Sequence, residues 1–183
     1  LGLGQYFDFP KPLFLIRKIL QLTTDKSDII LDFFAGSCTT ADAILRLNSE
    51  DGGKRQFIMV QLPEPIKPEL PAFKAGYRTI ADLGQERIRR AIQKIRASSA
   101  TIDTNIGDDL GFKSFRLSRS NFKSWHPSVE NNLTQLGTLF DQFETPLVDD
   151  WQKLALLTEI LLLQGFPLDS TIKSLPAFHE NDV

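Results

Sequence analysis

Ile29-Ile30-Leu31-Asp32-Phe33-Phe34-Ala35-Gly36-Ser37-Cys38-Thr39-Thr40 decides the fold of this chain. Three apolar residues lead to Asp32, small residues follow, and apolar side chains then recur at helical spacing, as at Ala41, Ile44 and Leu45. This order predicts a buried strand, a tight turn and a helix. Open α/β sheets bind small cofactors at such a turn, outside the carboxyl end of the strand.

The residues of the turn discriminate between cofactors. A phosphate-binding loop ends in Gly-Lys-Ser/Thr, but no lysine follows the turn until Lys54. A dinucleotide fold needs three closely spaced glycines, and this turn contains Gly36 alone. S-adenosylmethionine (SAM) carries a sulfonium and an ammonium group, which a carboxylate at Asp32 attracts. The alternative is an ordinary strand–turn–helix with Ser37 as N-cap, and the turn by itself leaves both interpretations open.

Several separate motifs resemble one enzyme family. Residues 32–40 (Asp-Phe-Phe-Ala-Gly-Ser-Cys-Thr-Thr) are similar to the SAM-binding motif D-x-F-x-G-S-G-T-T of the amino-methylating DNA methyltransferases. Residues 9–16 resemble their lysine-proline motif, which comes first in the circularly permuted β-type order. Residues 57–64, 77–88 and 110–122 resemble the modification (Mod) subunit of type III restriction–modification systems. The resemblance covers nearly the whole chain.

The resemblance implies an α/β fold, in which a partial Rossmann-like SAM-dependent methyltransferase sheet precedes a mainly helical C-terminal region. We expect residues 1–100 to form the SAM-binding part of the methyltransferase domain. Residues 101–183 are then a C-terminal α+β region for interaction or assembly. The implied activity is methylation of adenine N6 in DNA, with SAM as the cofactor. The implied partners are DNA, another methyltransferase subunit and the restriction (helicase–nuclease) subunit.

The same resemblance assigns cofactor-binding positions. Lys11 is expected to meet the SAM carboxylate, and Asp32 is the best single candidate for holding the cofactor. Gln61 ends the second strand, where relatives place an acidic residue on the ribose hydroxyls, so Glu64 competes for this role. The expected cofactor-binding residues are Lys11, Asp32, Phe34, Gly36, Ser37, Thr39 and Gln61. Ser37 and Thr39 either bind the methionine carboxylate or cap the helix.

The chain departs from the family pattern in two ways. Cys38 stands where the family has a second glycine, and we expect its Cβ and sulfur to crowd the cofactor. The catalytic tetrapeptide Asp/Asn/Ser-Pro-Pro-Tyr/Phe/Trp, which in the family orients the target base outside the helix, does not occur in the 183 residues. We therefore assign no catalytic residue, expect a fragment of a larger enzyme, and expect no DNA methylation by this chain alone. The alternative is a non-catalytic or degenerate module that docks another methyltransferase chain or the restriction subunit.

Composition excludes several classes of protein and site. The chain is 42% hydrophobic and has no apolar run near the ~20 residues of a membrane span. One cysteine and two histidines exclude an internal disulfide and make no convincing metal site. No signal peptide is visible, so we expect a cytoplasmic location. Residues 1–129 carry 19 basic and 14 acidic side chains, whereas residues 130–183 carry 2 basic and 9 acidic ones, which indicates two surfaces with different partners.

Hydrophobic periodicity and turn residues predict the elements. Strands are expected at 29–32, 56–62 and 111–117, and helices at 11–22, 38–48, 79–97, 133–143 and 151–164. The helix over 79–97 carries five cationic side chains outside its apolar stripe, at Arg87, Arg89, Arg90, Lys94 and Arg96. They contact DNA phosphates or form a solvated helix face, and we favour the solvated face.

Overall fold

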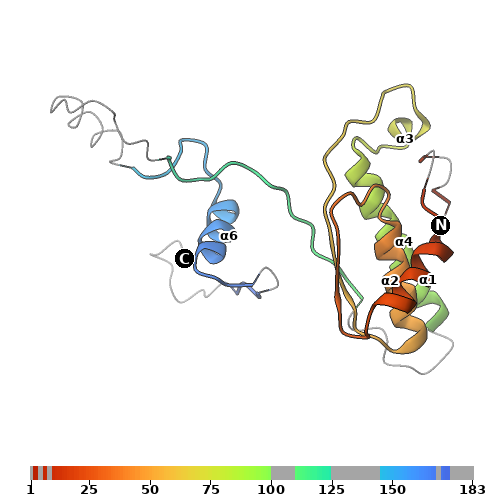
Figure 1. Cartoon of the computed structure of the whole chain (residues 1–183). Coiled ribbons are helices and arrows are strands. Elements are labelled where there is room, and N and C mark those ends of the chain that lie inside the picture. Colours follow the sequence, from red (N-terminus) through yellow and green to blue (C-terminus); the bar gives the residue numbers. More distant parts are fainter. Residues whose placement is uncertain are drawn as a thin grey trace, which may run out of the picture. The chain divides into compact units, whose positions relative to one another are not determined.

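The structure, a computed structural model, describes residues 2–3, 6–7, 10–99, 110–124, 145–167 and 170–173 (Figure 1). The helix predicted over 133–143 lies outside these residues. The chain divides into two units, Leu1–Phe112 and Lys113–Val183, which are described separately below.

Unit 1 is an α/β structure with a small parallel sheet. Strands β1 and β2 pair in register from Ile29 opposite Gln56 to Asp32 opposite Met59. The α/β class is thus confirmed, and the elements begin and end within a few residues of their predicted bounds. In chain order they are α1 (Leu13–Thr23), β1 (Ile29–Asp32), α2 (Thr39–Asp51), β2 (Gln56–Met59), α3 (Pro71–Lys74) and α4 (Ile80–Ser99).

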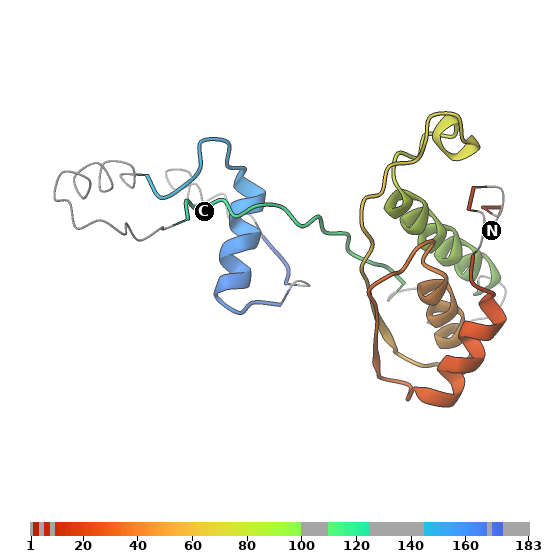
Figure 2. The same cartoon turned by 45° about the horizontal axis from the view of Figure 1, so that its top comes forward.

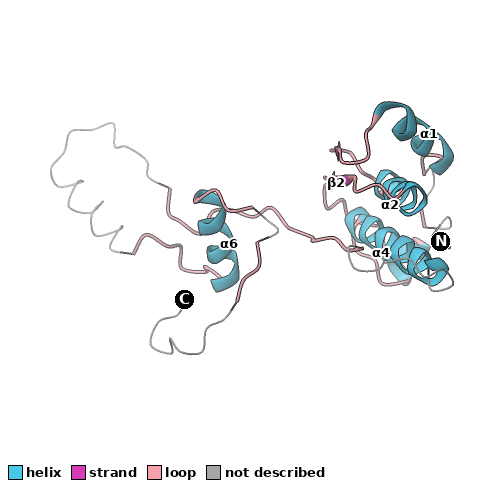
Figure 3. Cartoon of the chain, turned by 90° about the horizontal axis from the view of Figure 1, so that it is seen from below, coloured by secondary structure: helices cyan, strands magenta, loops and turns pink. Residues whose placement is uncertain are grey.

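Three helices form a layer against one face of the sheet. Helix α2 lies between α1 and α4 and contacts both (Figures 1 and 3). Ile30, Phe57 and Met59 pack against the apolar faces of these helices. Successive strand residues point to opposite faces, and on the other face Ile29 and Ile58 remain 62% and 52% exposed. The core therefore lies between the helices and one face of the sheet.

The proline-containing loop after β2 leads to α3 and back to α4 (Figure 2). Its two arms are joined where Ile66 N–H donates to Arg78 O (2.8 Å) and Ile80 N–H donates to Glu64 O (3.0 Å). The next helix starts with a reciprocal cap: Thr79 N–H donates to Asp82 Oδ2 (2.8 Å), and Asp82 N–H donates to Thr79 Oγ1 (3.2 Å). This arrangement is the Thr/Asp version of a capping box.

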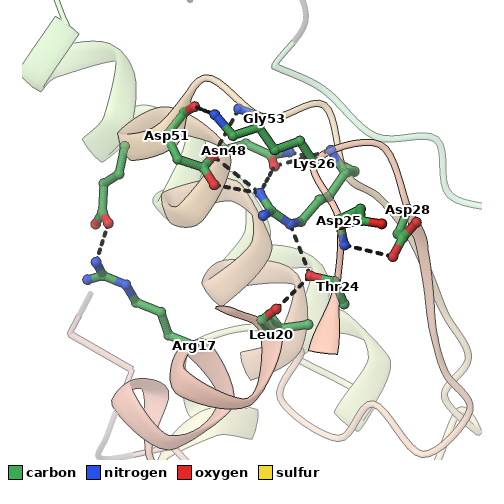
Figure 4. A network of polar contacts seen from close by, with 11 residues as sticks. Arg17, Leu20, Thr24, Asp25, Lys26, Asp28, Asn48, Asp51 and Gly53 are labelled. Carbon is green, nitrogen blue, oxygen red and sulfur yellow. Dashed lines mark hydrogen bonds and ion pairs between the residues drawn. The ribbon is translucent and has the colours of Figure 1, made fainter. Parts of the chain in front are cut away.

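A polar network lies at the amino end of the sheet. The Arg55 side chain is 5% exposed, and its guanidinium donates to Asp51 Oδ2 (3.0 Å) and to Thr24 Oγ1 (3.1 Å). Thr24, Asn48 and Asp51, at the C-terminal ends of α1 and α2, all form hydrogen bonds with Arg55. Figure 4 shows these three residues close together. The network joins both helices to the start of β2. It therefore lies at the opposite end of the strands from the predicted cofactor site.

Unit 2 contains α6 (Lys153–Leu163), which confirms the helix predicted over 151–164. The Glu159 carboxylate anchors this helix by accepting hydrogen bonds from Asn121 N–H (2.7 Å) and Asn121 Nδ2 (2.8 Å). The strand predicted over 111–117 is wrong: these residues have no regular structure, and Leu117 is fully exposed. An alternating pattern forms a strand only where a neighbouring strand pairs with it. None of the helices in the described residues is both long and apolar enough to cross a membrane.

Candidate cofactor site

The carboxyl end of β1 is organised around Asp32. One oxygen of its carboxylate accepts the Phe34 backbone N–H (3.2 Å), and the other accepts the Thr40 hydroxyl (2.6 Å). The carboxylate therefore spans the turn from the strand end to the first residues of α2. No role was expected for Thr40, although a hydroxyl on the second residue of α2 is well placed to orient a carboxylate at the strand end.

The turn itself is a left-handed bend. Gly36 has φ 52° and Cys38 has φ 56°, a conformation that glycine adopts without penalty and other residues rarely adopt. Gly36 N–H donates to Gln61 Oε1 (2.7 Å), and Ala35 N–H donates to Val60 O (3.1 Å). Asp32, Gly36 and Gln61, three of the predicted site residues, are thereby brought together at the carboxyl ends of both strands.

Gln61 also faces its predicted competitor. Its side-chain amide donates to Glu64 Oε1 (3.3 Å) while its carbonyl holds the bend. Gln61 is thus already engaged by protein groups on both sides. Of these two candidates, Glu64 is the one whose side chain carries a negative charge.

Cys38, which was expected to crowd the cofactor, directs its sulfur toward α4. It is the N-cap residue of α2 and makes no side-chain cap, so the alternative that places Ser37 at the N-cap is wrong. Its side chain is 5% exposed and packs among Ala35, Ala41 and Leu45. A Cβ built on Gly84 of α4 would lie 2.6 Å from the Cys38 sulfur, so the glycine makes room for the thiol. Burial, together with the charge of Asp32, raises the pKa of Cys38 to about 11.

Ser37 and Thr39 are covered by Arg87 of α4. The two residues are 8% and 4% exposed. Arg87 Nη1 donates to Ser37 Oγ (2.8 Å) and also to Thr39 Oγ1. The Arg87 side chain is 15% exposed, so the predicted solvated face is wrong for Arg87. The sequence carries a signal for the burial of Arg87, because this residue lies four residues after the buried Leu83 and four before the buried Ala91. Residues four apart lie on the same face of a helix.

Three other cationic residues of α4 have side-chain contacts within unit 1. Arg89 and Arg90 pair with Glu86. Arg96 donates to Leu110 O (2.8 Å). These contacts favour the solvated helix face over a phosphate-binding role for these side chains.

Lys11 and Phe34 lie on the surface. Lys11 is exposed just before α1, and Phe34 is 79% exposed, with its ring centroid 5.0 Å from that of Phe33. Phe7 approaches the bend, since a Cβ on Gly36 would lie 3.5 Å from Phe7 Cζ. A cavity of about 20 Å³ between Phe7, Ser37 and Arg87 has room for about one water molecule. This cavity is too small for a nucleoside-sized ligand.

Comparisons with known proteins assign a class to this arrangement. The DNA methylase family matches residues 2–70, which include α1, β1, the bend and β2. The chain is 47% identical over 111 residues to the Mod subunit of the type III restriction-modification enzyme StyLTI from Salmonella typhimurium, covering 61% of this chain and 16% of that protein. It is 34% identical over 172 residues to the EcoPI Mod subunit of Escherichia phage P1, covering 94% of this chain and 25% of that protein.

A type II enzyme is similar over a shorter stretch. The methyltransferase M.KpnI of Klebsiella pneumoniae is 44% identical over 85 residues, which cover 46% of this chain and 20% of that protein. Residues 2–70 of unit 1 are therefore similar to the DNA methylases. More particularly, the chain is related to the Mod subunits of type III restriction–modification enzymes, which confirms the resemblance seen in its motifs. The chain spans a quarter or less of the length of these relatives.

Proposed function

We propose that this chain supplies the SAM-binding part of a DNA adenine-N6 methyltransferase of type III restriction–modification character. The observation that carries the proposal is the bend at residues 35–39, where left-handed Gly36 is fixed by Gln61 beside the Asp32 carboxylate. Similarity to Mod subunits over nearly the whole chain supports it. The larger protein would complete a Rossmann-like sheet around β1 and β2.

The charge of Asp32 and the exposed surfaces at the strand ends support SAM as the ligand. Asp32 places a carboxylate where a positively charged ligand is attracted. Gly36 brings backbone rather than side chain to the surface of the bend, and the exposed Phe34 ring offers an apolar surface for the ligand. Lys11 is the exposed cation proposed for the carboxylate of the ligand. When bound, SAM supplies a methyl group on a sulfonium, ready for transfer to an amine.

The proposal assigns the isolated chain only half of the reaction. Its residues hold the donor, but the 183 residues contain no Asp/Asn/Ser-Pro-Pro-aromatic motif to orient the amine of the target base. Without an oriented acceptor the effective concentration of the reacting groups is lost. We therefore expect SAM binding without transfer of methyl groups to DNA.

Isothermal titration with SAM tests the proposal. The wild-type chain is expected to bind SAM saturably, and Asp32→Asn is expected to weaken binding about tenfold or more, because the residue loses its charge (~1.4 kcal/mol per factor of ten). Asp28→Asn is the matched control, since Asp28 lies at the other end of the same strand and accepts a hydrogen bond from Asp25 N–H. Absence of binding by the folded wild-type chain, or equal losses in both variants, would refute the assignment.

A second candidate function is assembly, favoured by the exposed face of the sheet. Ile29, Leu31 and Ile58 on that face are each more than half exposed. Apolar side chains on one continuous face are typical of surfaces that another protein segment covers. We propose the remaining part of a Mod-type methyltransferase as the occupant, because the relatives are at least four times longer than the matched region. Ile58→Lys is then expected to abolish pulldown of that part and to leave SAM titration unchanged; retained pulldown would refute this candidate.

A further inference from the structure

Arg87 connects α4 to the bend through contacts that no motif in the sequence predicts. Its Nη1 donates to Ser37 Oγ (2.8 Å) and to Thr39 Oγ1. Both acceptors are buried, and the Arg87 side chain is 15% exposed. Hydrogen bonds from a charged donor in such surroundings are among the stronger ones in proteins.

The charge of Arg87 is balanced by Asp42. Asp42 Oδ2 lies 3.6 Å from Arg87 Nε, and Asp42 Oδ1 accepts a hydrogen bond from Arg46 (2.6 Å). The Asp42 side chain is 2% exposed. Within the described residues, the buried Arg87 Nε lacks a hydrogen-bond partner. The guanidinium thus directs its hydrogen bonds to the bend, while Asp42 compensates its charge.

The bend requires external restraint. A non-glycine residue in the left-handed region, as at Cys38 with φ 56°, is about 1 kcal/mol less stable than in an ordinary conformation. Gln61 restrains the bend from the sheet by accepting Gly36 N–H. Arg87 restrains the next residues of the bend from the helix layer, through Ser37 and Thr39.

We propose that Arg87 is a positioning residue of the methyl-donor site: it holds residues 36–39 in the bend that receives the donor. The proposal rests on the proposed function, because it assigns Arg87 to the same site. Arg87 acts through Ser37 and Thr39. Loss of its hydrogen bonds therefore lets the bend open and lowers the affinity for SAM.

The chain contains its own probe for this opening. Cys38 is the only cysteine, lies inside the bend and is 5% exposed. In the absence of SAM, the rate at which a thiol reagent labels Cys38 reports how often the bend opens. The charge of Arg87 lowers the pKa of this thiol, so loss of the charge alone would slow labelling. Loss of the restraint would accelerate it, and the two effects therefore differ in sign.

The test compares Arg87→Gln with a matched control on the same carboxylate. Arg87→Gln is expected to accelerate labelling of Cys38 about tenfold or more and to weaken SAM binding by a similar factor, as expected for loss of a charged hydrogen bond. Arg46→Gln also removes a partner of Asp42 but does not touch the bend, and both quantities are expected to change less than about threefold. Arg87→Lys, which keeps a donor and the charge, is expected to lie between wild type and Arg87→Gln.

A second variant keeps the test decisive if Arg87→Gln folds poorly. Ser37→Ala removes an acceptor and leaves the guanidinium in place. It is expected to accelerate labelling in the wild-type background and to add little when combined with Arg87→Lys. Equal acceleration in both backgrounds would show that Arg87 does not act through Ser37.

Two failures can be distinguished. If the wild-type chain binds SAM and Arg87→Gln retains both wild-type affinity and wild-type labelling, the positioning role is overturned while the proposed function stands. Equal effects of Arg87→Gln and Arg46→Gln also overturn it, because they would trace the effect to Asp42. If the folded wild-type chain binds no SAM, the proposed function fails, and the role of Arg87 toward a donor fails with it.

Discussion

The contact between Cys38 and Gly84 gives the sharpest prediction about the bend. A Cβ on Gly84 would lie 2.6 Å from the Cys38 sulfur and 3.2 Å from Gly36 O. Gly84→Ala gains about 1 kcal/mol of helix propensity but overpacks the site, which destabilises by roughly 1–3 kcal/mol. We expect a net loss of about 1 kcal/mol in the wild-type background.

The effect of Gly84→Ala on stability is expected to change when the Cys38 thiol is removed. Cys38→Gly relieves a left-handed non-glycine residue, worth about 1 kcal/mol, and loses about as much buried side-chain surface, so it is expected to be nearly neutral. In that background Gly84→Ala is expected to be neutral or stabilising, which gives a coupling of about 1–2 kcal/mol between the two sites.

Urea unfolding of the four proteins, followed by circular dichroism at 222 nm, measures this coupling. Helices α1, α2 and α4 hold most of the helical residues that the structure describes, whereas both tryptophans, at positions 125 and 151, lie in unit 2. A coupling below about 0.5 kcal/mol is what independent sites show. That result would refute the orientation of the sulfur toward α4.

Three further outcomes are expected. Because the Cys38 sulfur faces α4, Cys38→Gly is expected to change the affinity for SAM by less than about threefold in calorimetry, and a large gain would instead show that the thiol obstructs the donor. Thr79→Ala removes one half of the capping box and is expected to destabilise unit 1 by about 1 kcal/mol in urea; Thr23→Ala, at the end of α1, is the control and is expected to have a smaller effect. Burial raises the pKa of Asp51, but the hydrogen bonds from Arg55 and Gly53 outweigh this effect and leave the pKa below 3.8. Asp51 therefore contributes its full stabilisation above pH 3.8. This contribution is lost as the pH falls through the lower pKa of the folded state. Asp51→Asn is therefore expected to remove part of the acid-side loss of stability in a pH series, and an unchanged pH profile would contradict the pairing.

The order of elements in unit 1 could be predicted from sequence because local signals agree with the packing. The apolar run before Asp32 and the spacing of Ala41, Ile44 and Leu45 each have one structural interpretation, and both strands and all three long helices form as predicted. The segment over 111–117 failed because strand formation depends on a partner. Alternating residues alone carry no information about that partner.

The sequence predicted which residues of the candidate site lie together, but not the contacts that they make. Motif matching placed Asp32, Gly36 and Gln61 together, since all three follow from the ends of two adjacent parallel strands. It could not place Arg87, which lies about 50 residues from the bend in sequence and reaches it only through the packing of α4 on α2. The direction of the Cys38 side chain depends equally on a distant residue, Gly84.

Titration of the ¹⁵N-labelled chain with SAM, followed by amide chemical shifts, tests most directly where the donor binds. We expect saturable shifts at the amides of Phe34, Gly36 and Gln61, and unchanged amides at Lys26 and Gly53 at the opposite end of the strands. Shifts confined to that opposite end, or no saturable shifts in the folded chain, would contradict this expectation.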